Sequence, residues 1–174
     1  MRRLLLAIAV LVGAVVVIAG VGALLPKGHV ATRSARFRQA PEAIWAVLAD
    51  RAGAPSWRPD VRSVEVLPPR DGRAVWRETW KDGDQILFEE TEAVPPRRMV
   101  TRIADPNLPF GGRWIIEISP ADGGSTVRIT EDGEVYNPIF RFLTRFVFGP
   151  TGTIEAFLKA LRRKFGEETA ILDY

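Results

Sequence analysis

Residues 4–25 form an uninterrupted apolar run, LLLAIAVLVGAVVVIAGVGALL, without a charged or strongly polar side chain. A helix rises about 1.5 Å per residue, so this run reaches about 33 Å, enough for the roughly 30 Å hydrocarbon core of a bilayer. Buried core helices of soluble proteins are usually shorter and carry a polar stripe. We therefore predict an N-terminal transmembrane anchor over residues 1–25 and a single-pass protein of the cell membrane.

A cleaved signal peptide is the alternative for the same segment. Arg2 and Arg3 form a charged start, and residues 21–23 (VGA) resemble a weak small-residue cleavage site. The apolar run is about twice as long as a usual signal core and continues past that site, which favours an uncleaved anchor. Basic residues flank both ends of the run, and the two sides give opposing counts, so the side of the membrane is not assigned.

The charge of the chain is divided unevenly between this segment and the rest. Residues 1–41 hold six of the 24 Lys and Arg and no acid, which leaves 18 basic and 21 acidic residues behind them. The basic excess therefore flanks the apolar run, where lipid headgroups favour it. The remainder has no basic field of the kind that nucleic acid requires, so a nucleic-acid partner is not expected.

The scarcity of Cys and His removes several classes of chemistry. The chain has no cysteine, so disulfides, thiolate nucleophiles and cysteine metal sites are excluded. His29 is the one histidine, and it lies beside the apolar run, ahead of the expected core, which argues against a His-based triad or a multi-His metal site. P-loop and GxSxG motifs are also missing. We predict no metal and no cofactor, and we lean against an enzyme.

Residues 34–168 predict one α+β domain, behind a linker over residues 26–33 and ahead of a tail over residues 169–174. A strand over residues 34–39 precedes a helix that begins at Pro41. Turn residues then separate six short strands, and no helix-length crossover lies between them, which indicates an antiparallel meander. These strands cover residues 61–67, 73–80, 85–93, 98–104, 113–119 and 125–136.

The chain ends in helix. Asn137 and Pro138 form a cap-and-start pair, and Gly149 and Pro150 interrupt the element that follows. An amphipathic helix comes next, with an apolar face made of Ile154, Phe157, Leu158, Leu161 and Phe165. A strongly curved sheet cannot touch a straight terminal helix everywhere, so we expect a cavity between them.

The order of these elements and several phrases resemble the SRPBCC superfamily, which includes START domains, the birch-pollen-allergen-like fold and polyketide cyclase/dehydrase-like proteins. The likeness covers residues 33–166, and the phrases resemble a membrane-anchored bacterial subfamily of the polyketide cyclase-like proteins. They are APEAIWAVLAD, RPDVRSVEVL, PPRRMVTRIADPNLPFGGRWIIEI and TEDGEVYNPIFRFLTRFVFG. The resemblance implies a helix-grip (START-like) fold with a hydrophobic ligand cavity, in which a curved antiparallel sheet wraps around a long C-terminal helix. It implies no particular reaction.

Glu131 is the one candidate acid for catalysis. It alternates with Val127, Ile129 and Gly133 on the face of the last strand that should line the cavity, where a carboxylate could act as an acid or hold a ligand. Two alternatives stay open. Glu131 pairs with an arginine such as Arg102 or Arg113, or a bulge at Gly133 turns it outward.

Further candidate ligand-binding residues lie around the expected pocket mouth and wall. The segment before the second strand could grip a polar head, although its Arg and Asp could equally hold their own loop together. The loop over residues 105–112 could cover the pocket, dip into the bilayer or be an ordinary turn. Tyr136 could donate its hydroxyl near Glu134 or pack at the strand-to-helix corner. Besides Glu131 and Tyr136, the candidates are Trp57, Arg58, Asp60, Trp76, Glu78, Trp80, Leu108 and Phe110.

The sequence thus predicts a membrane-tethered domain that binds a hydrophobic small molecule or lipid and is not catalytic. Its partners are the bilayer, through residues 4–25, and that ligand; the oligomeric state is not assigned. Two alternatives are kept: a cyclase- or dehydratase-type enzyme that uses Glu131 as acid or base, and a structural or partner-binding module whose cavity has filled in.

Overall fold

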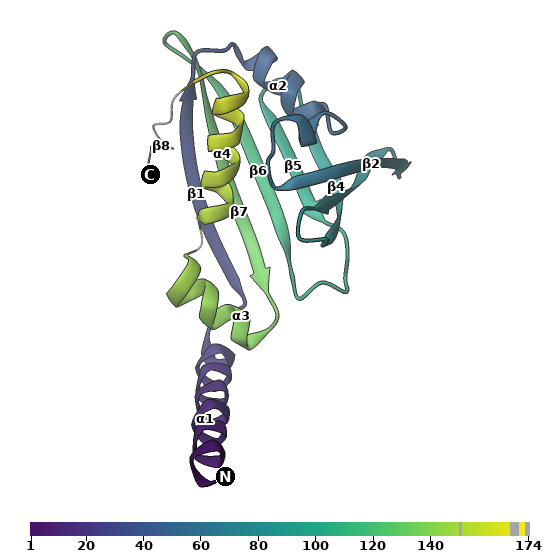
Figure 1. Cartoon of the computed structure of the whole chain (residues 1–174). Helices are drawn as coiled ribbons and strands as arrows, with labels where there is room; N and C mark the ends of the chain where they lie inside the picture. The colour runs from purple at the N-terminus through teal and green to yellow at the C-terminus, as the bar shows by residue number, and fades with distance from the viewer. Residues whose placement is uncertain (150, 168–170, 173–174) are drawn as a thin grey trace.

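One curved antiparallel sheet dominates the computed structural model, which describes residues 1–149, 151–167 and 171–172 (Figure 1). The strand order is β2-β3-β4-β5-β6-β7-β1-β8, so consecutive strands from β2 to β7 are neighbours and the first strand joins at the far edge of the meander. All six predicted meander strands are confirmed. They are β2 (Val61–Arg70), β3 (Arg73–Trp80), β4 (Gln85–Val94), β5 (Arg98–Ile103), β6 (Phe110–Ala121) and β7 (Gly124–Val135).

The first strand, β1 (Gly28–Phe37), corrects the prediction of a linker over residues 26–33. It starts six residues earlier than predicted and pairs with β7 over its whole length, from Gly28 opposite Glu134 to Phe37 opposite Ser125. The physical reason is that β7 is long, and its backbone N–H and C=O groups need a partner along all of it. Of the predicted tail over residues 169–174, β8 (Ile171–Leu172) pairs with β1, and the other residues lie outside the described part of the chain.

The predicted helices are confirmed at both ends of the domain. α2 (Pro41–Ala49) has its proline in the first turn, and η1 (Ala54–Ser56) follows it. α3 (Pro138–Leu143) begins at Asn137, whose side chain accepts hydrogen bonds from the N–H groups of Ile139 and Phe140 at 2.9 and 3.3 Å. It continues as a π-helical turn, η2 (Thr144–Phe148), which ends at Gly149 with φ of 75°.

The last helix, α4 (Gly152–Lys164), lies across one face of the sheet and supplies much of the core (Figure 1). Its Ile154, Leu158 and Leu161 are fully buried against the sheet, which confirms the predicted apolar face, and α2 adds Ile44 and Leu48. The sheet contributes a matching layer of apolar side chains at the same end of the domain: Ala35, Phe37, Met99, Ile116, Ile118, Val127 and Ile129.

The N-terminal helix α1 (Arg2–Leu24) extends away from the domain with its apolar side chains exposed, and it is long and apolar enough to cross a membrane (Figure 1). Its last turn packs on α3, where a Cβ added to Gly22 would overlap the backbone oxygen of Pro138. Arg141 of α3 donates hydrogen bonds to the backbone oxygens of Leu25, at 2.8 Å, and of Ala23, at 3.5 Å. The end of α1 is therefore attached to the domain by specific contacts.

Candidate functional site

A cavity of about 1040 Å³ lies between the sheet, the first half of α4 and the loop that precedes β6. Its size is that of a site for a large organic ligand. Nine of the ten predicted ligand-binding residues line it: Trp57, Arg58, Asp60, Trp76, Glu78, Trp80, Leu108, Phe110 and Glu131. The cavity is inconsistent with the alternative of a domain whose interior has filled in.

Tyr136 is the predicted site residue that the structure places elsewhere. Its hydroxyl donates to Glu134 at 2.8 Å, as anticipated, but the ring lies half exposed at the strand-to-helix corner and does not line the cavity. The carboxylate of Glu134 stabilises the protonated phenol and raises the pKa of Tyr136. Since this pair is turned away from the cavity, we do not include Tyr136 in the site.

An aromatic layer separates the cavity from the buried core. Phe157 of α4 is its centre, with Trp57 and Trp114 packed edge to face against it at centroid distances of 5.3 and 5.4 Å. All three rings line the cavity and also contact the core. The sequence placed Phe157 on the helix face and Trp57 in the site, but did not select Trp114, which a period-two reading of β6 would have placed beside Ile116.

Glu131 points into the cavity and is held by three partners. Its Oε1 lies 3.0 Å from Nε2 of His29, and its Oε2 accepts from Nε1 of Trp114 at 2.7 Å and from Oγ1 of Thr153 at 3.2 Å. Trp114 and Glu131 are directly opposite each other on adjacent strands, which explains their contact. The carboxylate remains partly accessible, with 17% of its side chain exposed.

Both alternative explanations offered for Glu131 prove wrong. Arg102 pairs with Glu89 instead, and Arg113 pairs with Asp132. The strand register continues without a shift through Gly133, so there is no bulge to turn Glu131 outward.

His29 is the functional residue that the sequence analysis misplaced. It was taken to lie ahead of the folded core, but it belongs to β1 and lines the cavity. Gly133 faces it across the strand pair, and a Cβ there would lie 2.5 Å from Cε1 of the imidazole, so the glycine makes room for the ring. An imidazole and a carboxylate that share a hydrogen bond can accept and return a proton.

A second polar cluster surrounds Glu78 on β3. Arg58 donates to Glu78 at 2.9 Å and to Asp60 at 3.0 Å, and Nε1 of Trp76 donates to the same Glu78 oxygen at 3.2 Å. The predicted Arg58–Asp60 pair is thus present, but it also reaches across to the sheet. Among the described residues, Oε2 of Glu78 and Nε1 of Trp80 have no hydrogen-bond partner.

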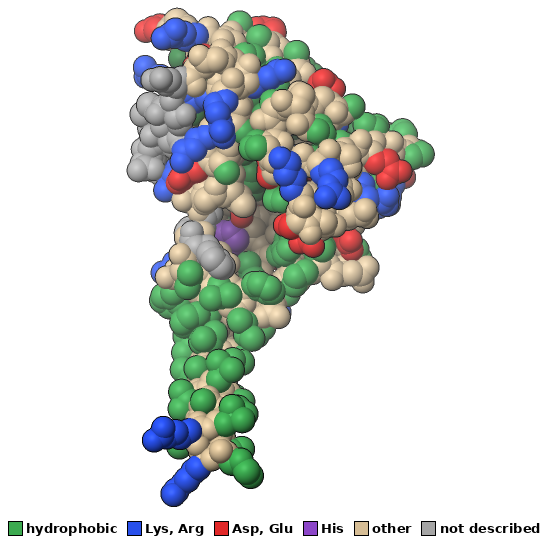
Figure 2. All heavy atoms as spheres, viewed as in Figure 1, with side chains coloured by type: hydrophobic (Ala, Val, Ile, Leu, Met, Phe, Trp, Pro, Cys, Tyr) green, Lys and Arg blue, Asp and Glu red, His purple; other side chains and the backbone are tan. Residues whose placement is uncertain are grey.

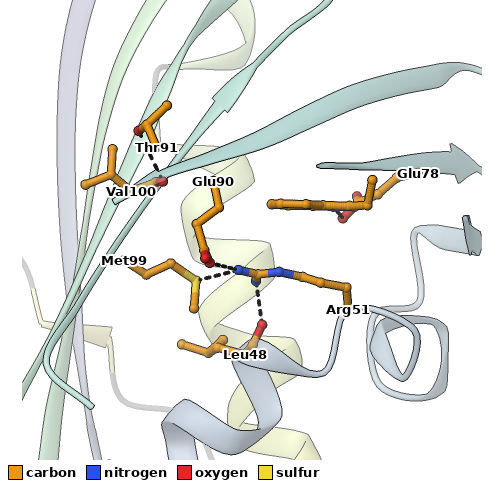
Figure 3. Close-up of polar contacts among 8 residues, drawn as sticks. Leu48, Arg51, Glu78, Glu90, Thr91, Met99 and Val100 are labelled. Carbon is orange, nitrogen blue, oxygen red and sulfur yellow. Dashed lines mark hydrogen bonds and ion pairs between the residues drawn. The ribbon is translucent and has the colours of Figure 1, made fainter. Parts of the chain in front are cut away.

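A third cluster, centred on Arg51, was not predicted (Figure 3). Its guanidinium donates to Glu90, to the backbone oxygen of Leu48 and to the sulfur of Met99, and it lies 4.4 Å from the ring centre of Trp76. Burial lowers the pKa of Arg51, and the nearby Glu90 opposes that shift. The loop sequence around Arg51 carries no pattern that would have revealed these partners.

None of the described residues form a group of three or more His, Asp or Glu side chains that could hold a metal ion. The polar chemistry of the cavity is therefore that of three separate carboxylate clusters, centred on Glu131, Glu78 and Glu90, within a largely apolar wall.

Comparison with solved structures supports the fold. The chain is similar to the protein TTHA0849 from Thermus thermophilus, with 24% identity, a TM-score of 0.62, and coverage of 79% of this chain and 95% of that one. It is also similar to XoxI from Bacillus cereus, with 20% identity, a TM-score of 0.57, and coverage of 80% and 96%. At these identities the likeness is one of fold.

A third similar structure is the di-domain ARO/CYC BexL from the BE-7585A biosynthetic pathway, with 18% identity and a TM-score of 0.55. The match covers 84% of this chain and 49% of BexL. No curated protein matches the sequence significantly. The sequence model of one family, described as "Polyketide cyclase / dehydrase and lipid transport", matches residues 29–166.

Proposed function

The chain belongs to the polyketide cyclase/dehydrase and lipid transport family, and from this premise we propose that it is a membrane-tethered domain that binds a hydrophobic small molecule or lipid. The observation that carries the proposal is the cavity of about 1040 Å³, whose wall is largely apolar. Apolar ligands enter such a site because their transfer out of water is favourable in proportion to the area buried.

The polar groups of the wall favour an amphiphilic ligand. Oε2 of Glu78 and Nε1 of Trp80 are buried without partners among the described residues, which leaves one acceptor and one donor unused. A ligand hydroxyl could donate to the first and accept from the second after small side-chain shifts, and an unused buried polar atom favours such a partner.

Retention of the anchor is part of the proposal. Cleavage after Ala23 would separate Gly22 from Pro138 and remove one of the backbone oxygens that Arg141 binds. These contacts join α1 to the domain and support an uncleaved helix over a signal peptide. The tether then holds the cavity beside the bilayer, which makes a membrane-derived ligand the first to test.

Native mass spectrometry of the full chain, released from detergent micelles, tests the proposal. We expect a bound lipid or other apolar molecule, and we expect the fluorescent probe N-phenyl-1-naphthylamine to compete with it. Ala156→Trp should fill the cavity and abolish probe binding, because Ala156 lines the wall, whereas Val66→Trp on the exposed face of β2 should bind as the wild type does. A wild-type protein that takes up neither lipid nor probe would refute the proposal.

A second candidate function, a dehydratase- or cyclase-type enzyme, is favoured by the 3.0 Å contact between His29 and Glu131 inside the cavity. In a dehydration, the pair would take the proton α to a carbonyl, and the electrons of that C–H bond would form the new double bond. The β-hydroxyl would leave as water after accepting a proton from the same pair.

A long-chain β-hydroxyacyl N-acetylcysteamine thioester is a suitable probe for this second function. Mass spectrometry should detect the loss of one water, and Glu131→Gln and His29→Gln should each remove that activity. Glu65→Gln, on the exposed outer face, is the matched control and should leave it unchanged. No turnover by the wild type would leave ligand binding as the function.

A further inference from the structure

Apolar side chains are concentrated on the surface of α3 and η2. Phe146 and Val147 are 60% and 61% exposed, and Ile139 and Phe140 are also open to the surroundings. Between Glu134 and Glu155 the sequence holds no acid, and its charged residues there are Arg141 and Arg145. Exposed aromatic and aliphatic residues accompanied by arginine are typical of helices that lie in a membrane interface.

The contact with α1 fixes the depth of this segment. Gly22 lies inside the apolar run, three residues before its end at Leu25, which is about 5 Å along a helix. Because Pro138 packs directly on Gly22, the start of α3 lies at the level of the last turn of the candidate span. A helix at that depth cannot be surrounded by bulk water when α1 crosses a bilayer.

Arg141 holds the two helices together. It donates to the backbone oxygens of Ala23 and Leu25, where α1 ends with unpaired carbonyl groups, and to the backbone oxygen of Tyr136. A cation at a helix C-terminus is favoured by the helix dipole. The contact also places a positive charge where phospholipid headgroups lie.

The same segment forms one side of the cavity. Phe140, Thr144 and Gly149 line it, opposite Leu108 and Phe110 of the preceding loop and strand. Figure 2 shows the apolar side chains of α1 continuing onto the α3 region, with the histidine visible in a hollow directly above. Residues 138–147 therefore contact the candidate span on one side and the ligand cavity on the other.

We propose that residues 138–147 form an interfacial foot that rests in the headgroup layer, and that the cavity opens beside it onto the bilayer. A hydrophobic ligand then passes between the acyl chains and the cavity along the apolar surface of the foot, without crossing bulk water. This inference rests on the proposed tether and ligand cavity, and it specifies the surface that contacts lipid and the route of exchange.

The absence of cysteine makes the depth of the foot directly measurable. Single-cysteine variants of the full chain, Phe146→Cys and Val66→Cys, would carry a nitroxide in vesicles of phosphatidylcholine and phosphatidylglycerol. Both native side chains are highly exposed, but the second is on β2, away from α1. We expect the label at 146 to collide with membrane-dissolved oxygen and to be shielded from an aqueous nickel chelate, and the label at 66 to behave in the opposite way.

The exchange route is tested by the rate at which N-phenyl-1-naphthylamine moves from such vesicles into the cavity. Phe146→Asp and Val147→Asp place a carboxylate on the foot at positions that do not line the cavity. We expect transfer about tenfold slower or worse, because a carboxylate is costly to desolvate. Equilibrium binding of the probe delivered from detergent should not change, and Val66→Asp should leave both quantities as in the wild type.

Each outcome separates this inference from the proposed function. A label at 146 as accessible to the nickel chelate as the label at 66 would refute the foot, and unaltered transfer in the Asp variants would refute the route, while binding from detergent would still support the cavity. A wild type that binds no probe from detergent would instead refute the proposed ligand function itself.

Discussion

Glu78 and Glu131 face the same cavity and share one device, a tryptophan Nε1–H that donates to the carboxylate. The bond from Trp76 to Glu78 is 3.2 Å long, and that from Trp114 to Glu131 is 2.7 Å long. The remaining partners differ in kind. Glu78 is paired with a guanidinium, Arg58, which is always charged, whereas Glu131 meets an imidazole, His29, which gains and loses a proton near neutral pH.

The difference separates a structural carboxylate from one that can do chemistry. The Arg58–Glu78 pair is nearly buried, with 12% and 6% of the two side chains exposed, and neither group can exchange a proton under ordinary conditions. The His29–Glu131 pair is more accessible to the cavity and can change its protonation when a ligand binds. Four substitutions test this contrast, in order of decreasing effect.

Glu78→Ala should cause the largest loss of stability. It leaves the Arg58 guanidinium buried beside Trp80 and Phe157 with only Asp60 as an ionic partner. Removing one member of a buried ion pair costs about 3–5 kcal/mol, which for a protein of this size lowers the melting temperature by roughly 10 °C or more. Thermal unfolding of the full chain in detergent, followed by circular dichroism, measures it.

Glu65→Ala is the matched control for that variant. Glu65 pairs with Arg77 on β3, but both side chains are substantially exposed, so the expected loss is below about 1 kcal/mol. If the two variants unfolded at the same temperature, the structural role of Glu78 would be disproved.

Glu131→Ala should destabilise the protein by only about 1–2 kcal/mol, the value of the hydrogen bonds it removes. Its three donors all lie at the cavity wall, where water or ligand can replace the carboxylate. The same thermal measurement applies. A loss as large as that of Glu78→Ala would remove the contrast between the two carboxylates.

Gly133→Ala should displace His29 from Glu131 at a cost of about 1 kcal/mol, because the added methyl group must push the imidazole aside. The chain has a single histidine, so the ring nitrogen signals in ¹⁵N NMR are unambiguous. They should shift in Gly133→Ala much as they do in Glu131→Gln. Unchanged signals in Gly133→Ala would mean that the ring does not occupy the space left by the glycine. Gly123→Ser, a substitution in an open turn, serves as the distant control.

The smallest effect concerns Glu89, a third carboxylate, which is paired with Arg102 and Arg73 outside the cavity. Hydrogen bonds from these arginines hold its pKa below the ordinary value of 4.5. The pair therefore stabilises the fold above pH 4.5, and this contribution disappears as pH falls through the lowered pKa. Both arginines are half exposed, so solvent screens the effect. Glu89→Gln should make the acid side of the stability curve shallower, and an unaltered curve would contradict the pairing.

The sequence was sufficient for the fold because its signals are local. Turn residues bound the six meander strands, the Asn137 cap marks the start of α3, and the apolar spacing of α4 identifies its buried face. Alternation along β7 also placed Glu131 on the cavity side correctly, since that property depends only on its neighbours in the strand.

The partners of Glu131 could not be predicted because they depend on distant register. His29 precedes it by 102 residues, and their contact requires β1 to begin at Gly28 and pair with β7 without a shift. The first half of β1 carries few of the bulky apolar residues that mark a strand, so the sequence indicated a linker there. Arg51 was missed for a similar reason, because its partners come from α2, β4 and β5.

The connection between α1 and β1 consists of residues 25–27, which span at most about 10 Å when extended. With α3 also fastened to the end of α1, a domain anchored in this way cannot swing freely above the membrane or reach an opposing bilayer. It travels by lateral diffusion, and it meets donors and acceptors only within the leaflet beneath it. Delivery of cargo therefore becomes a two-dimensional search, in which the surface density of partners, rather than their concentration in solution, sets the rate.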